Sequence, residues 1–184
     1  MRKSSKVLAV VLACALAVGG AIGGTMAWLS DKTAAVKNVF TYGNVGITLT
    51  ETTDDFHIVP GRVIAKDPKV TVAADSEDCY VFVKVEQKDW SEKFTYTMAA
   101  GWNALNGVDG VYYCEAEKSQ SDRFLPVLLN DQVKVLDTLT KADIDAAVEK
   151  NQNPTLTFTA YAIQKEGFEN AADAWKEVGP GKNA

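Results

Sequence analysis

Apolar and polar residues alternate along much of the chain after residue 40. Over 45–49 three aliphatic residues are separated by glycine and threonine, over 81–85 valine returns at every second position, and over 156–162 the period of two is seen again. Because successive side chains of a strand point to opposite faces, this period predicts β-strands. Turn signals such as Pro60-Gly61 and Asn106-Gly107 separate the runs. The pattern therefore predicts a mainly β chain, folded as an antiparallel jelly-roll or immunoglobulin-like β-sandwich with short connecting helices.

Two short helices are predicted between the strands. The first begins after Thr140 and runs through Ala147, with Asp143 at its third position, where the carboxylate can complete a capping box. The second runs over 170–178, and Gly179-Pro180 ends it. The other strands are predicted at 70–72, 80–86, 94–97, 111–115, 132–136 and 155–164.

The first 27 residues differ in character from the rest. Three cations precede an apolar run over 7–27 that ends in small residues. These are the three parts of a secretory signal peptide, so we expect cleavage between Ala27 and Trp28 and a protein that works outside the membrane. The alternative is a retained N-terminal anchor, since the run is long enough to cross a bilayer. The predicted organisation is a signal peptide (1–27), an N-terminal arm (28–40) and a single β-sandwich domain (41–184).

The charge of the mature protein narrows the range of partners. Removal of the signal peptide takes away three cations and no acid, which moves the formal net charge from −5 to −8. An acidic surface argues against nucleic acid as a partner, because phosphate binding requires cations. It also argues against attachment to an anionic membrane by charge, so membrane contact is expected only through the uncleaved signal segment. No cofactor is expected, because the sequence has neither a phosphate loop nor a dinucleotide fingerprint.

Residues that could carry catalysis or bind a metal are few. His57 is the one histidine, so no zinc site with two or three histidines can form. Asp54, Asp55 and His57 are the candidates for a metal contact, and the alternative is a solvated loop before Pro60-Gly61. No catalytic residue is predicted, because the sequence has no zinc-binding helix motif and no nucleophile elbow. The sequence therefore favours a binding or structural role over an enzyme.

Two cysteines follow the signal peptide, Cys79 and Cys114, and each lies in a predicted strand. In an extracellular protein, two such residues on adjacent strands can form a disulfide. The alternative is a pair of separate buried thiols that behave as small apolar side chains. Both alternatives stay open, because the sequence does not show whether the two side chains face each other.

The residues around the predicted cleavage site resemble those of a known family. Gly24-Thr25-Met26-Ala27-Trp28-Leu29-Ser30-Asp31 is followed by Asn38-Val39-Phe40-Thr41-Tyr42-Gly43-Asn44-Val45. Further matching segments occur in the same order at 60–61, 66–70, 80–85, 160–168 and 174–175. Together these short segments are similar to those of the TasA/camelysin family of exported Gram-positive proteins. The similarity spans nearly the whole chain. The resemblance implies a jelly-roll-like sandwich and cleavage by a SipW-type signal peptidase.

The resemblance to the fibre-forming members also implies a function. It implies a structural protein of the cell surface or the biofilm matrix, in which the arm of one subunit completes a sheet of the next. The partners would then be further copies of the chain or sister matrix proteins. Such an arm can add to an exposed sheet edge, and the alternative is that it pairs within its own subunit. The apolar arm residues suited to this are Trp28, Leu29, Val36, Val39 and Phe40.

Two other functions remain open. Camelysin is described as a metallo-endopeptidase, so the resemblance also implies a secreted peptidase, although no zinc motif of this chain supports one. The third hypothesis is a matrix accessory protein or adhesin that binds a larger fibre or a glycan without polymerising. The three hypotheses differ in what the isolated mature protein does: it polymerises, it cleaves protein, or it stays monomeric until it meets a partner.

Overall fold

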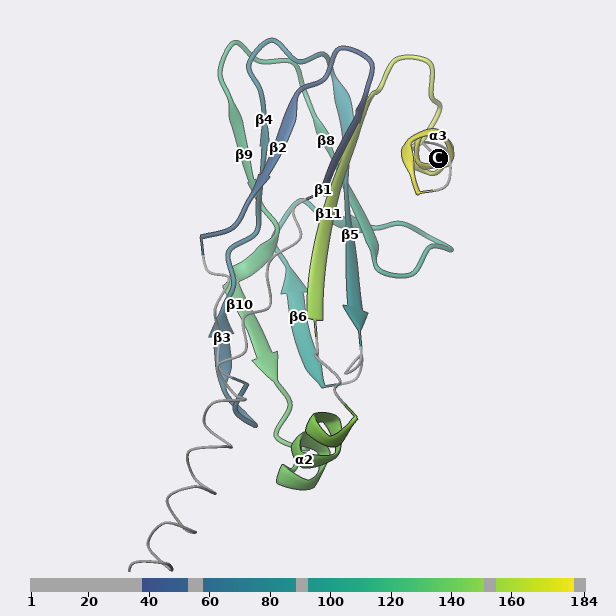
Figure 1. The fold of residues 1–184 in the computed structure, drawn as a ribbon. Coiled ribbons are helices and arrows are strands. Elements are labelled where there is room, and N and C mark those ends of the chain that lie inside the picture. Colours follow the sequence, from purple (N-terminus) through teal and green to yellow (C-terminus); the bar gives the residue numbers. More distant parts are fainter. Residues whose placement is uncertain (1–37, 53–57, 89–92, 151–154, 181–184) are drawn as a thin grey trace, which may run out of the picture.

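A computed structural model describes residues 38–52, 58–88, 93–150 and 155–180 (Figure 1). The strands are β1 (Asn38–Tyr42), β2 (Ile47–Thr50), β3 (Val63–Ala65), β4 (Lys69–Val72), β5 (Cys79–Lys88), β6 (Phe94–Met98), β7 (Asn103–Ala104), β8 (Val111–Ala116), β9 (Arg123–Pro126), β10 (Leu128–Val135) and β11 (Thr155–Gln164). The helices are α2 (Lys141–Glu149) and α3 (Ala171–Val178). Within the described ranges, no helix has the length and apolar character needed to cross a bilayer.

The strands form two layers. One layer is a five-stranded sheet in the order β1-β11-β5-β8-β7, in which β5 pairs antiparallel with both β11 and β8. The second layer consists of two three-stranded sheets, β2-β4-β9 and β3-β10-β6, which follow one another along the length of the molecule (Figure 1). The predicted mainly β sandwich with short helices is confirmed. One pairing departs from the antiparallel pattern, because β1 runs parallel to β11.

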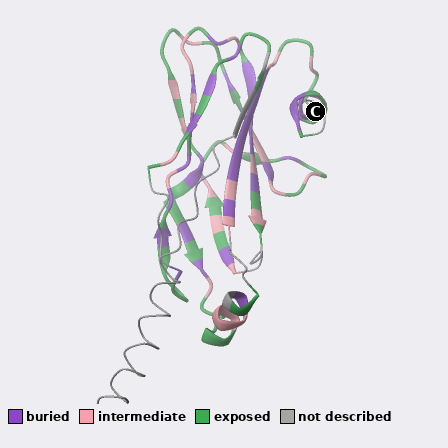
Figure 2. Cartoon of the chain, viewed as in Figure 1, coloured by how far each residue is buried: buried purple, intermediate pink, exposed green. Residues whose placement is uncertain are grey.

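The main hydrophobic core lies between the two layers. As the alternation predicts, one face of β5 contributes Val81, Val83 and Val85, and β11 adds Phe158. The second layer contributes buried side chains from both of its sheets, among them Val133 of β10. Figure 2 shows the buried residues along the strands of both layers. Each fully buried aliphatic side chain of this kind stabilises the fold by roughly 1.5–3 kcal/mol relative to an exposed one.

The outer face of the five-stranded sheet is also covered. Tyr80 and Phe82, on the second face of β5, form a separate core with Tyr161 of β11 and with α3. The Trp175 ring of α3 lies with its centroid 5.2 Å from that of Phe82 and 5.0 Å from that of Tyr161. Strand β5 is therefore buried on both faces, which explains why five consecutive residues at its start are buried.

Both helices begin at a capping side chain, of which the sequence analysis predicts the one at Thr140. The Asp143 N–H donates to Thr140 Oγ1 at 3.2 Å, and the Thr140 N–H donates to Asp143 Oδ2 at 2.8 Å, which is a reciprocal capping box. This hydrogen bond to Thr140 lowers the pKa of Asp143. Helix α3 begins at Asn170, whose side chain accepts from the Asp173 N–H at 3.0 Å. The structure extends α2 to Glu149, two residues beyond the predicted end.

A buried ion pair connects the end of β2 with the segment between β3 and β4. The side chains of Lys66 and Glu51 form this pair and are 4% and 5% exposed. Lys66 Nζ also lies 5.6 Å from the centroid of the Phe158 ring, within the range of a cation–π contact. Next to it, Asp67 accepts hydrogen bonds from Thr52, at 2.9 Å from the N–H and 2.6 Å from the hydroxyl. The sequence predicts only a break between strands at this point.

Candidate functional site

Strand β1 forms one edge of the five-stranded sheet. Its five residues pair in parallel with Thr159–Ile163 of β11. The opposite side of β11 pairs with β5 along its whole length, Thr155–Gln164. Among the described residues, the first four residues of β11, 155–158, therefore have a paired strand on one side only. Backbone N–H and C=O groups at such an edge can pair with an added strand.

The end of the arm lies within its own subunit. Val39 and Phe40 belong to β1, so this part of the arm follows the alternative in which it pairs with its own sheet. The remaining residues named for the arm and for its cleavage lie outside the described ranges, and their predictions stay open: Ala27, Trp28, Leu29 and Val36. The structure identifies the edge of β11 as the place that the arm reaches, which the sequence does not show.

A turn directly after β1 leads from the edge strand to the second layer. Gly43 has a φ of 81°, and a Cβ there would lie 2.6 Å from Gln164 Oε1, so both conformation and space favour glycine. The residues that follow are held firmly: the Gly46 N–H donates to Ser76 Oγ at 3.1 Å, and its carbonyl accepts from the Ala73 N–H at 2.8 Å. Gly43 therefore forms the turn between β1 and the residues that are hydrogen-bonded to the second layer.

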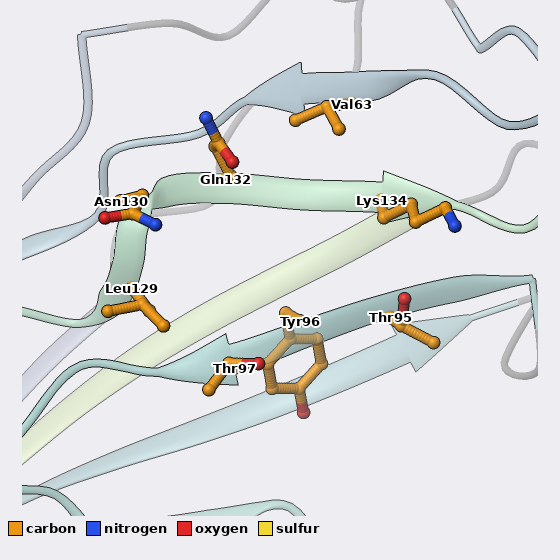
Figure 3. A pocket seen from close by; sticks show the side chains of 8 residues that line it. All are labelled: Val63, Thr95, Tyr96, Thr97, Leu129, Asn130, Gln132 and Lys134. Atoms are coloured by element: carbon orange, nitrogen blue, oxygen red, sulfur yellow. The ribbon is translucent and has the colours of Figure 1, made fainter.

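A shallow depression of about 310 Å³ lies on the β3-β10-β6 sheet (Figure 3). Two aliphatic side chains on its lining are exposed, Val63 at 54% and Leu129 at 47%. Among the lining residues that the structure describes, Lys134 is the charged one. The other lining residues are polar or aromatic: Thr95, Tyr96, Thr97, Asn130 and Gln132. Such a surface suits a ligand with both apolar and hydrogen-bonding groups, such as a peptide segment or a glycan.

Strand β10 bulges at this depression. Residues 129–132 of β10 face residue 97 alone in β6. Within the bulge, Asn130 and Asp131 have φ values of 56° and 53°, in the left-handed region that residues other than glycine seldom adopt. The Asp131 carbonyl accepts from the Lys66 N–H at 2.7 Å. The bulge therefore turns Leu129 and its neighbours outward at a fixed place on the sheet.

The candidate metal contacts lie outside the described residues. His57, Asp54 and Asp55 fall in the range 53–57, so their prediction stays open. In the ranges that the structure does describe, no group of three or more histidine, cysteine, aspartate or glutamate residues is arranged to hold a metal ion.

Cys79 and Cys114 are free thiols in the structure, which is the second of the two alternatives. They lie on the adjacent strands β5 and β8 and belong to the main core. Cys79 pairs with Ala116 and Cys114 pairs with Val81, so the two cysteines are diagonal neighbours on one face of the sheet. Burial raises the pKa of Cys79 to about 11 and that of Cys114 to about 12. Both thiols are therefore protonated at neutral pH in the folded protein.

No protein-family model matches the chain, and no curated protein matches it.

Proposed function

We propose that this protein is a secreted structural protein of the cell surface or biofilm matrix, and that it assembles by donating its N-terminal arm to a sheet of the next copy. The observation that carries the proposal is the parallel pairing of β1 with Thr159–Ile163 at the edge of the five-stranded sheet. This pairing supports the idea that the backbone at the end of the arm can act as a strand at that edge.

Exchange between copies requires no new type of contact. The edge of β11 offers the same partners to the β1 of a second copy as to its own, and a pivot at Gly43 would release β1. The donor lies at the N-terminus and the acceptor at β11, so the contact is head-to-tail. A head-to-tail contact that does not close into a ring produces a filament.

The edge at residues 155–158, which has no partner on this side among the residues that the structure describes, would extend the exchange. A strand that continues toward the N-terminus from β1 would run beside this part of β11, because the two strands are parallel. In a filament, arm residues before Asn38 from the neighbouring copy would occupy this position, and their apolar side chains would add to the affinity. Cleavage by a SipW-type signal peptidase after Ala27 would free the arm for this role.

The test is the behaviour of the isolated mature protein, residues 28–184. We expect it to polymerise into filaments at micromolar concentration, with light scattering that rises over time and filaments seen by electron microscopy. Addition of other matrix proteins should not be required. A protein that stays monomeric in sedimentation at every concentration tested contradicts assembly by self-exchange.

The depression on β3-β10-β6 favours a second candidate function, an accessory protein or adhesin that binds a fibre or glycan without polymerising. For this function, Leu129→Glu should weaken co-sedimentation with matrix fibres about tenfold, because a charge replaces an exposed apolar contact. Its thermal unfolding should stay close to that of the unchanged protein, since the side chain is exposed.

The matched control is Phe124→Glu, which changes an exposed apolar residue of β9 that does not line the depression. It should bind as the unchanged protein does. Equal loss of binding in both variants would assign the effect to charge rather than to the depression.

A further inference from the structure

Two lysines on the outer face of the second layer have no ion-pair partner. Lys69 of β4 and Lys134 of β10 are exposed and alternate with buried valines of the main core, so both point away from that core. Neither forms a hydrogen bond or an ion pair with any residue that the structure describes. Most other described lysines do form an ion pair, at 66, 84, 93, 118, 141, 165 and 176. Although the chain as a whole is acidic, this face therefore offers two cations to an anionic ligand.

The two lysines lie on either side of the depression. Lys134 belongs to its lining, whereas Lys69 pairs with Pro126, which precedes the Leu129 end of the lining. From Pro126 to Lys134 the sheet advances about five residue steps when the bulge is left out, or roughly 17 Å. Asp131, within the bulge, is an exposed acid, and it is not part of the lining. One extended anionic ligand that crosses the depression can therefore contact both lysines.

The polar side chains of the depression are also free to bind a ligand. Thr95, Thr97, Asn130 and Gln132 are exposed, and within the described part of the chain their side chains form no hydrogen bond. Figure 3 shows them on β6 and β10, on the two sides of the depression. Amide and hydroxyl groups both donate and accept hydrogen bonds, as the hydroxyl groups of a sugar do. The lining therefore suits a ligand with many hydroxyl groups.

The place of the depression on the sheet argues against a bound peptide. The depression lies on the face of β10 and β6, which pair with each other, and not at a free strand edge. A peptide that adds as a strand requires such an edge, because its backbone supplies the hydrogen bonds. A peptide helix requires an apolar groove, whereas Val63 and Leu129 are the aliphatic residues among the described lining. Recognition at this place therefore depends on polar side chains and on two apolar contacts.

We propose that the depression binds an acidic polysaccharide, whose carboxylate groups contact Lys134 and Lys69 and whose hydroxyl groups bond to the polar lining. The proposal rests on the second candidate function and deepens it, because it names the ligand of the same depression. It does not depend on whether the protein polymerises. Binding of this kind weakens as salt rises, because dissolved ions screen the attraction between exposed charges.

The experiment is a calorimetric titration of the mature protein, residues 28–184, with a short oligogalacturonate, which is a chain of sugar acids. We expect saturable binding at low salt, weakened about threefold or more when sodium chloride rises from about 50 to about 200 mM. Lys134→Gln should weaken binding about threefold, and Lys69→Gln combined with Lys134→Gln about tenfold, as expected for exposed ion pairs. Both variants should unfold at nearly the same temperature as the unchanged protein, because both side chains are exposed. A titration that shows no binding at low salt would overturn the proposal.

The matched control is Lys88→Gln combined with Lys150→Gln. It removes the same charge from two exposed lysines that also form no ion pair in the described ranges, at the end of β5 and directly after α2. The control should bind the oligogalacturonate as the unchanged protein does. Equal weakening in the control would assign the effect to net charge and overturn the site.

A second ligand separates a polysaccharide from an acidic peptide. Polyglutamate of matched length and charge should bind at least about tenfold more weakly than the oligogalacturonate, because it lacks hydroxyl groups for the polar lining. Equal affinity would overturn the assignment of the ligand. Fibre co-sedimentation without oligogalacturonate binding would overturn the ligand and leave the accessory function standing. Oligogalacturonate binding without fibre co-sedimentation would support the ligand and contradict the binding of fibres.

Discussion

Deletion of residues 28–40 is expected to leave a protein that stays monomeric under conditions in which the intact mature protein polymerises. The deletion removes the predicted arm and the first three residues of β1, so the protein can no longer donate a strand. The edge of β11 at Thr159–Ile163 remains and can still receive one. Analytical ultracentrifugation at matched concentrations measures the difference, and electron microscopy should show no filaments of the shortened protein.

A mixture of the two proteins makes this test sharper. The shortened protein can accept an arm but cannot donate one, so it should end a growing filament and shorten the mean length in proportion to its share of the mixture. Deletion of residues 181–184 at the other terminus is the control and should leave polymerisation unchanged. Filaments formed by the shortened protein alone would exclude the arm as the donor.

Lys66→Met is expected to lower the free energy of unfolding by roughly 3–5 kcal/mol, because it removes the cation of a buried ion pair and keeps the Glu51 carboxylate in the interior. The side chain of methionine is similar in size to that of lysine, so the loss does not come from a cavity. The contact of the ammonium group with the Phe158 ring is also lost. Urea unfolding followed by tryptophan fluorescence measures the change. We expect the slope of the unfolding free energy against urea concentration to stay the same.

Two controls separate the buried charge from a general effect of the substitution. Lys66→Met combined with Glu51→Leu removes both charges and should recover most of the stability, because a buried pair can be replaced by apolar residues at little cost. Lys141→Met breaks the exposed pair of Lys141 with Asp145 on α2 and should change stability little. A Lys66→Met variant as stable as Lys141→Met would contradict the proposed importance of the buried pair.

The local features of the fold could be predicted closely from the sequence. The predicted strand over 155–164 has the same bounds as β11, and the alternation over 81–85 assigns the core face of β5 correctly. The cap at Thr140 is also confirmed. These features depend on side-chain periodicity and on hydrogen bonds between residues three apart, both of which the sequence contains.

Other features could not be predicted because they interrupt or extend the local pattern. Strand β10 begins at Leu128 and not at residue 132, because the polar bulge at Asn130 and Asp131 interrupts its alternation. The second face of β5 is buried because α3, about 90 residues later in the chain, packs against it. The ion pair of Lys66 with Glu51 joins residues 15 apart that no motif connects.

The candidate site also combines features that the sequence predicts with features that only the tertiary structure decides. The sequence identifies an apolar segment before the first alternating strand and two cysteines in strands, because composition and periodicity suffice for both. Only the tertiary structure decides that the end of this segment pairs in parallel with β11 and that Cys79 and Cys114 are diagonal neighbours. The physical reason is that strand register and burial are set by the packing of segments far apart in the chain, whereas strand and helix positions are set by neighbours within a few residues.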